Sequence, residues 1–170
     1  DRLFYGLRNA TATVESVPLI ASSILSKKHA EGLAALVLDI KAGSGSSFVE
    51  EEQSLALAKG LVGLGAQLGI RTVGIRSAMD QPLGQMVGNA LEVQESIDCL
   101  EGSGPADLRQ LTVVLGGALL AAAGLADDDA GGEAQISRVL DSGQAREFFG
   151  RGISAQGGRL EELALEAKAE

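Results

Sequence analysis

Two short aliphatic stretches separated by one helical stretch constrain the fold of this chain most. The stretch LVLDI, within residues 35–40, is bounded by glycines and reads as a buried strand, and residues 71–77 (RTVGIRS) form a second candidate. Between them, residues 50–69 carry leucines broadly along one side of a helix. A strand, a helix and a strand in this order form a parallel crossover unit, so the sequence predicts an α/β fold.

The remaining stretches read mainly as helices. Ser47, with Glu50 three residues later, resembles a capping box at the start of the helix between the two strands. An apolar stretch at 113–124 predicts a buried helix opened by Pro105, and 127–133 reads as a polar turn. The other predicted helices cover residues 88–100, 134–143, 145–156 and 159–170.

Composition limits the classes of partner. The chain has 170 residues and a net charge of −9, which argues against a nucleic acid or an anionic membrane as its partner, although solubility alone also explains the acidity. Cys99 is the single cysteine, so no internal disulfide forms and a reducing compartment fits. No apolar run approaches the roughly 20 residues of a membrane span, so we expect no membrane partner.

Three side chains near the start form a candidate binding group. Ser16 and Pro18 mark a helix start, and Ser23 and Lys27 lie four residues apart on one face of that helix. Arg8 precedes the helix. A guanidinium, a hydroxyl and an ammonium suit a planar, oxygen-rich heterocycle that gains negative charge.

Spacing alone favours a plainer interpretation of these residues. Lys27 and Lys28 are then a solvated last helical turn, and Arg8 is a surface ion-pair partner. His29 has no nearby Cys or second His, so the sequence indicates no transition-metal site.

The glycine-rich segment KAGSGS, at 41–46, follows the first strand and invites a phosphate-loop interpretation. It lacks the Gly-Lys-Ser/Thr ending of a P-loop and the spacing of a dinucleotide motif, so we interpret it as a turn. Phe48 either covers a bound ring or packs under the turn, and the sequence does not separate these alternatives.

Four segments carry a family resemblance: RNATATVESVPLIASSILSKK, LVLDIKAGSGSSF, SAMDQPLG and GNALEVQESIDCLEGSGPADL. In this order they resemble the pyrimidine nucleoside phosphorylases, the family that includes the thymidine phosphorylases. The resemblance implies a two-lobe architecture of the type shared with phosphoribosyltransferases. Residues 1–30 would then belong to the helical lobe and 31–170 to the α/β lobe. Members are more than twice this length, so we expect the chain to be a central piece without the phosphate-binding loop.

The resemblance implies phosphorolysis of pyrimidine nucleosides: thymidine and phosphate yield thymine and 2-deoxyribose 1-phosphate. Arg8 and Lys27 would bind the two ring carbonyls and Ser23 the N3 edge. Family members usually carry Asp after the arginine, whereas this chain has Asn9, a weaker neutral acceptor. No catalytic residue is assigned within this piece, and we expect the isolated chain to be inactive.

The resemblance also implies a potassium ion bound by the backbone carbonyls of Leu83 and Met86 and the side chain of Glu95. Oxygen ligands suit such a hard cation. The alternative is that Glu95 is one of several exposed helical carboxylates. No organic cofactor is expected, and the full-length protein is expected to be a cytoplasmic homodimer.

Two other functions compete. A phosphoribosyltransferase of the anthranilate type shares the two-lobe architecture, but it needs pyrophosphate- and magnesium-binding motifs that we do not find here. A non-catalytic binding or signalling role is the second alternative. A phosphorolysis assay separates these possibilities.

Overall fold

The computed structural model describes residues 2–160 and residue 162. These residues form an α/β fold, as predicted. The chain divides into two compact units, one of residues 1–81 with 122–125 and the other of residues 82–121 with the chain from 126 onward. Each unit is described on its own below.

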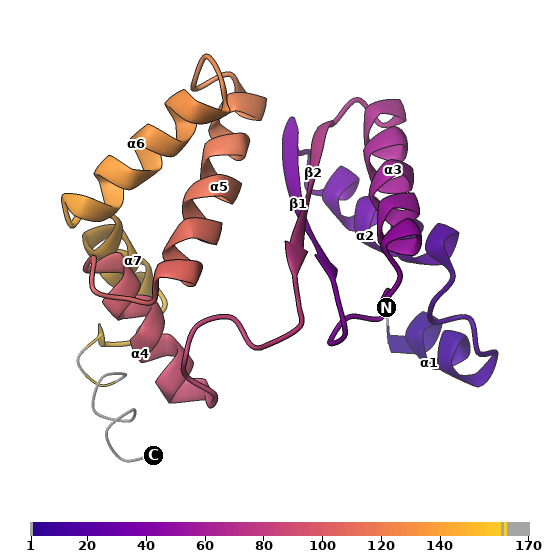
Figure 1. The fold of residues 1–170 in the computed structure, drawn as a ribbon, viewed down its shortest axis with the longest axis horizontal. Coiled ribbons are helices and arrows are strands. Elements are labelled where there is room, and N and C mark those ends of the chain that lie inside the picture. The colour runs from indigo at the N-terminus through magenta and orange to yellow at the C-terminus, as the bar shows by residue number, and fades with distance from the viewer. Residues whose placement is uncertain (1, 161, 163–170) are drawn as a thin grey trace. The chain divides into compact units, whose positions relative to one another are not determined.

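The first unit contains the predicted strand–helix–strand crossover (Figure 1). Strand β1 (Ala35–Ala42) and strand β2 (Arg71–Ala78) pair in parallel over their whole length, and helix α3 (Glu51–Gln67) connects them. Both strands extend one or two residues beyond the predicted ranges. Parallel pairing requires such a crossover because each strand must start again at the same edge.

The hydrophobic core of this unit lies on one face of the strand pair. Helix α2 (Val17–Ala30) and α3 both pack there, and Leu25 and Leu61 are almost completely buried among their neighbours. Gly74 of β2 lies against Ile40, and a Cβ built on it would come within 3.0 Å of the Ile40 side chain. Leu57, Leu61 and Leu64 lie in or against this core, as the spacing of leucines predicts, whereas Leu55 is exposed.

The opposite face of the strand pair carries a polar network near the carboxyl ends of the strands. Lys41 Nζ lies 2.6 Å from Asp39 Oδ2 and donates a hydrogen bond of 2.9 Å to Ser77 Oγ. Ser77 Oγ in turn donates to Asp39 Oδ1 at 2.5 Å. Lys41 and Ser77 are register partners, so these side chains tie the two strands together where the pair ends.

Two local predictions in the first unit differ from the structure. Residues Arg2–Ala10 form a helix, α1, that the sequence analysis missed, although Leu3, Phe4 and Leu7 lie at helical spacing along it. The predicted capping box at Ser47 is wrong: α3 begins at Glu51 after the N-cap residue Glu50, and no side chain caps it. The acidic side chains of Glu51 and Glu52 still favour this helix start electrostatically.

The second unit is helical. Helix α6 starts at Asp129, inside the stretch predicted as a turn, because Asp128 accepts a hydrogen bond from the Gly131 N–H at 2.7 Å and caps the helix. Its helices are α4 (Asn89–Leu100), most of α5 (Ala106–Ala123), α6 (Asp129–Asp141) and α7 (Gln144–Ala155).

Close contact between α5 and α6 depends on glycine. A Cβ built on Gly132 would lie 2.3 Å from the backbone oxygen of Gly117, and one on Gly117 would lie 2.6 Å from the Glu133 backbone nitrogen. Neither position has room for a side chain. These glycines therefore allow the two helix backbones to approach each other closely.

Helix α5 differs from the sequence prediction in two ways. It has 18 residues with a mean hydropathy of 1.3, so by length and composition alone it is long enough to cross a membrane, contrary to our prediction. Core helices of soluble proteins meet the same criterion. In addition, only Gly117 and Ala118 of this helix are buried, although its apolar sequence predicted extensive burial.

Two predictions about domain and chain organisation stay open. The lobe boundary at residue 30 is not tested by the compact units, whose division falls between Gln81 and Pro82. The predicted charged helix at 159–170 falls mainly outside the described residues.

Candidate functional site

A cavity of about 470 Å³ in the first unit is lined by residues of α1, α2 and the turn that joins them. Arg8 comes from the last turn of α1, and Ser23 comes from the middle of α2. The structure therefore brings together two of the residues that the sequence singled out. The lining side chains are Phe4, Tyr5, Leu7, Arg8, Thr11, Thr13, Leu19, Ser22, Ser23 and Ser26.

Tyr5 joins these residues to Lys27, and the sequence prediction missed it. Its hydroxyl forms a hydrogen bond of 2.8 Å with Ser23 Oγ. The Arg8 guanidinium carbon lies 5.3 Å from the centroid of the Tyr5 ring, and Lys27 Nζ lies 5.6 Å from it. Tyr5 precedes Arg8 by three residues, the spacing that places two side chains on one helix face, so a helix predicted at 2–10 would have revealed it.

The cationic surroundings change the acidity of Tyr5. Its hydrogen bond with Ser23 lowers the pKa of the phenol, and the positive charges of Lys27 and Arg8 lower it further. A phenolate is therefore easier to form here than in free tyrosine. The same positive environment suits a ligand that gains negative charge.

Arg8 is held by the turn between α1 and α2. Its Nη2 donates to the backbone oxygen of Val14 at 2.5 Å. Its Nε is buried and has no hydrogen-bond partner among the described residues. A buried donor without an acceptor is costly, so this N–H is an unsatisfied group of the described structure.

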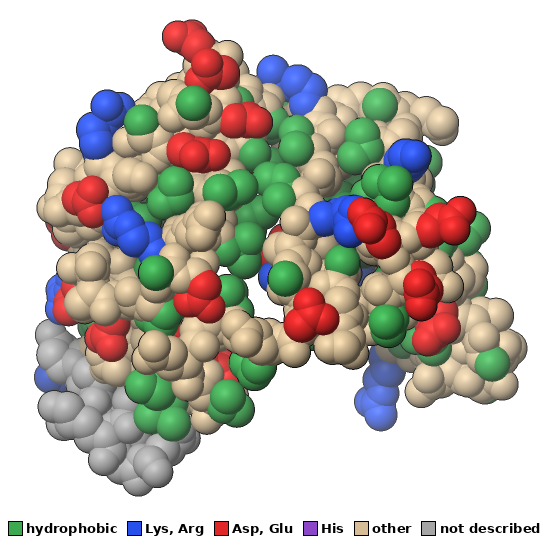
Figure 2. Space-filling view, in the orientation of Figure 1, with side chains coloured by type: hydrophobic (Ala, Val, Ile, Leu, Met, Phe, Trp, Pro, Cys, Tyr) green, Lys and Arg blue, Asp and Glu red, His purple; other side chains and the backbone are tan. Residues whose placement is uncertain are grey.

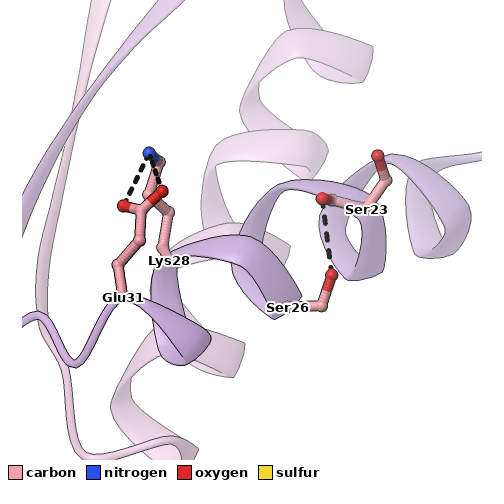
Figure 3. Close-up of polar contacts among 4 residues, drawn as sticks. All are labelled: Ser23, Ser26, Lys28 and Glu31. Atoms are coloured by element: carbon pink, nitrogen blue, oxygen red, sulfur yellow. Dashed lines mark hydrogen bonds and ion pairs between the residues drawn. The ribbon is translucent and has the colours of Figure 1, made fainter. Parts of the chain in front are cut away.

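The two neighbouring lysines have different surroundings. Lys28 pairs with Glu31 at 3.0 Å near the end of α2, whereas Lys27 lies near the Tyr5 ring (Figure 3 shows Lys28 and Glu31 apart from Ser23). The plainer interpretation gave the surface ion pair to Arg8, which instead donates to the Val14 backbone oxygen. Lys27 is exposed, as that interpretation expects of a solvated last turn. Lys27 lies near the Tyr5 ring, which also contacts Ser23 and Arg8.

The glycine-rich turn after β1 uses its backbone donors internally. The Ser44 N–H donates to Asp80 Oδ1 at 2.9 Å, and the Gly45 N–H donates to the Met79 oxygen at 2.8 Å. The Ser46 N–H donates to the Gly43 oxygen at 3.0 Å, and the Phe48 N–H donates to Ser46 Oγ at 3.1 Å. These donors are not free to hold a phosphate group.

Phe48 packs against the hydrophobic core of the first unit and is half-buried. It does not line the cavity beside Arg8 and Ser23. The structure thus favours the second of the two alternatives for this side chain, an aromatic ring packed under the turn.

Glu95 and the segment from Leu83 to Met86 come together in the second unit. The Glu95 side chain is 7% exposed, and its Oε1 accepts hydrogen bonds from the Gln85 and Met86 N–H groups at 2.8 and 3.2 Å. The interpretation of Glu95 as an exposed helical carboxylate is therefore wrong, because the loop covers it.

A second carboxylate holds the same loop. The Gly84 N–H donates to Asp107 Oδ2 at 3.0 Å, and this bond is the main reason that the pKa of Asp107 is lowered. Across the described residues, no three His, Cys, Asp or Glu side chains gather as metal ligands. Any cation at this loop would therefore depend on backbone oxygens together with Glu95.

Charge is distributed without strong segregation on the face drawn in Figure 2, where acidic and basic side chains are interspersed. The ion pairs of the second unit include Arg109 with Asp141 at 2.7 Å and Arg146 with Glu101 at 2.5 Å. These pairs neutralise charge locally and leave the net charge of −9 unchanged.

The parallel crossover defines an α/β protein, and the cavity between α1 and α2 is lined by hydroxyl groups and the Arg8 guanidinium. Residues 1–146 match the glycosyl transferase family, a/b domain. The chain belongs to this family.

Curated relatives are similar over nearly the whole chain. It is 52% identical over 157 residues to thymidine phosphorylase of Homo sapiens and 48% identical over 157 residues to that of Mus musculus; each alignment covers 92% of this chain and 33% of the relative. It is 46% identical over 158 residues to pyrimidine-nucleoside phosphorylase of Bacillus subtilis, covering 93% of this chain and 36% of the relative. The chain therefore spans about a third of the length of these relatives.

Proposed function

We propose that the protein containing this chain is a pyrimidine nucleoside phosphorylase and that this segment holds the pyrimidine base. The observation that carries the proposal is the grouping of Arg8, Ser23 and Lys27 around one aromatic ring beside the cavity. The names of the relatives support the same reaction class.

The proposed chemistry follows from the charges of these side chains. When phosphate attacks C1′ of the sugar, the base departs and negative charge spreads to its two carbonyl oxygens. Arg8 and Lys27 would stabilise that charge, and the Ser23 hydroxyl would orient the ring through its N3 edge. Fixed donors placed where charge develops lower the barrier without forming a covalent bond to the base.

A potassium ion is a second part of the proposal. The Leu83 and Met86 carbonyls with Glu95 would supply hard oxygen ligands. The residues fit the ion because Glu95 is a buried carboxylate whose described partners are backbone N–H groups, with no Lys or Arg ion pair among the described residues. The ion would fix the loop, and no step of the reaction passes through it.

The remaining functional expectations are also proposals. The full-length protein would be a cytoplasmic homodimer that acts on a pyrimidine nucleoside and phosphate, with no organic cofactor and no nucleic-acid or membrane partner. The buried free thiol of Cys99 fits a reducing compartment. Phosphoribosyl transfer of the anthranilate type and a non-catalytic signalling role are less well supported, since the reported relatives are named as phosphorylases.

Phosphorolysis by the purified full-length protein tests the proposal. We expect Arg8→Ala and Lys27→Ala each to lower kcat/KM, because each removes a charged donor. The expected loss corresponds to roughly 2–4 kcal/mol of transition-state stabilisation. Thymine release from thymidine and phosphate is the measurement.

Lys28→Ala is the matched control, because it removes a neighbouring ammonium that pairs with Glu31 on the surface. We expect its kcat/KM to stay close to the wild-type value. Near-normal turnover in both Arg8→Ala and Lys27→Ala, or equal losses in all three variants, would contradict the assignment.

A further inference from the structure

Two carboxylates hold three successive backbone N–H groups in the loop before α4. The Gly84 N–H donates to Asp107 Oδ2 at 3.0 Å. Glu95 Oε1 accepts hydrogen bonds from the Gln85 and Met86 N–H groups at 2.8 and 3.2 Å. The apolar side chains at both ends of this segment are exposed, so they give the loop little anchoring. The conformation of the loop therefore depends on these hydrogen bonds.

The hydrogen bond from Gly84 also fixes the direction of the Leu83 carbonyl. The Gly84 N–H and the Leu83 C=O belong to one planar peptide unit, and no cis peptide bond occurs among the described residues. In a trans unit these two groups point in opposite directions. Because Asp107 accepts the N–H, the Leu83 oxygen points away from Asp107.

The other carboxylate lies close to the same glycine. A Cβ built on Gly84 would lie 2.1 Å from Glu95 Oε2, so this oxygen reaches the backbone of the loop. Two N–H groups occupy Oε1, whereas Oε2 accepts no hydrogen bond from the residues that the structure describes. Glu95 therefore keeps one oxygen for another partner beside Gly84.

Asp107 is attached to a regular element rather than to the loop itself. It lies in the first turn of α5, where the helix dipole favours a carboxylate. Its side chain is exposed and contacts the loop through a backbone N–H. Asp107 can therefore hold the loop without being a ligand.

We propose that Asp107 is a positioning residue for a monovalent cation: by holding the Gly84 N–H, it fixes the orientation in which the Leu83 carbonyl is presented to the ion. This inference rests on the potassium site of the proposed function. It adds a residue that acts through the peptide unit it holds. Partners that orient metal ligands in this way have large effects on metal affinity.

Thermal titration of the full-length protein tests the inference. The melting temperature is measured while potassium chloride replaces tetramethylammonium chloride at constant ionic strength. The readout is the potassium concentration that gives half of the stabilisation. Asp107→Ala removes the acceptor of the Gly84 N–H, so we expect this concentration to rise roughly tenfold or more. Asp107→Asn keeps an oxygen acceptor, so its value should stay within about threefold of the wild type.

Asp128→Ala is the matched control. Asp128 also accepts a hydrogen bond from a glycine, the Gly131 N–H at 2.7 Å, but it does so at the start of α6. Its loss should lower the melting temperature, because it removes a helix cap. We expect the potassium concentration at half of the stabilisation to stay at the wild-type value.

An unchanged potassium concentration in Asp107→Ala would overturn the inference. An equal rise in Asp107→Asn would overturn it as well, since the negative charge rather than the hydrogen bond would then be responsible. A wild type that potassium stabilises no more than the organic cation does would instead overturn the proposed potassium site. The wild type and the Asp107 variants thus separate the two failures.

Discussion

Neighbouring residues with identical side chains have different roles at the end of α2. Lys28 forms an ion pair with Glu31, whereas Lys27 lies near the Tyr5 ring together with Arg8. The difference arises because successive helix positions point about 100° apart, so only one of the two faces α1. Which lysine contacts Tyr5 therefore depends on its position around the helix axis, and not only on its being a lysine.

The titration of Tyr5 is the first prediction at the residue scale. We expect its phenol to ionise at a lower pH than free tyrosine, because Ser23 donates a hydrogen bond to the phenolate and Lys27 and Arg8 add positive charge. Ultraviolet difference spectra between the wild-type full-length protein and Tyr5→Phe isolate this one group.

The same contacts predict how the pKa of Tyr5 changes when Ser23 is replaced. Ser23→Ala should raise the pKa of Tyr5 again, since it removes the largest cause of the lowering. Identical titration curves for Tyr5 in the wild type and in Ser23→Ala would show that the Tyr5–Ser23 bond is absent in solution.

Glu95 carries a second residue-scale prediction. If the Leu83 and Met86 carbonyls and Glu95 bind potassium as proposed, the thermal stability of the full-length protein should increase more with potassium than with a bulky organic cation at equal ionic strength. Glu95→Gln should abolish that difference, since the amide supplies no negative charge to the ion. Melting temperature in the two salts is the measurement.

Asp107→Asn provides the comparison for the potassium experiment. Asp107 holds the same loop through Gly84 but is not a proposed ligand. This variant should lower stability in both salts and keep the potassium effect. If Glu95→Gln keeps the potassium effect as well, the metal site has to be abandoned.

Helix α3 contains one glycine in close contact with a strand and one that faces open space. A Cβ built on Gly65 would lie 2.1 Å from the Thr72 Oγ1 of β2, whereas one on Gly63 would meet nothing within 4 Å. The first glycine is required for close packing of the helix against the strand. The second is exposed and only weakens the helix.

Alanine at these two positions should therefore have opposite effects. Gly65→Ala should lower the free energy of unfolding by about 1–3 kcal/mol, because Thr72 must shift to make room. Gly63→Ala should raise it by about 0.5–1 kcal/mol through helix propensity. Chemical denaturation of the full-length protein measures both, and a loss of stability in both variants would contradict the described packing of α3.

The sequence predicted most of the elements that contribute buried apolar residues, and it missed α1, which contributes none. The strands, α3 and α5 follow from aliphatic runs and glycine boundaries. The proposed roles of Arg8, Ser23 and Lys27 come from the family resemblance, because spacing alone favoured a solvated turn. Helix α1 was missed although Leu3, Phe4 and Leu7 lie at helical spacing, and Tyr5 was missed with it. The α6 start was missed because Asp128 caps a helix that opens with two glycines at 131 and 132.

At the scale of the whole molecule, the isolated 170 residues have little core for their length. The first unit has a two-stranded parallel sheet, and its described helices α2 and α3 pack on the same face. Parallel sheets normally have more strands and cover on both faces. Helix α5 is apolar, yet only two of its residues are buried.

We therefore expect the isolated chain, made recombinantly, to be partly ordered or prone to aggregation. Hydrogen exchange and light scattering should detect this, and thymidine with phosphate should release no thymine. A monodisperse, fully protected chain would contradict the expectation about order. Steady thymine release that disappears in its Lys27→Ala variant would show that the catalytic groups lie within this segment.

The Asp80 carboxylate has a consequence for how the loops at the end of the strand pair can evolve. It accepts hydrogen bonds from the backbone and the hydroxyl of Ser44, and a Cβ on Gly43 would lie 2.7 Å from it. These hydrogen bonds connect the loop after β1 to the loop after β2. An insertion or deletion in either loop would move Asp80 away from Ser44, so the lengths of the two loops constrain each other.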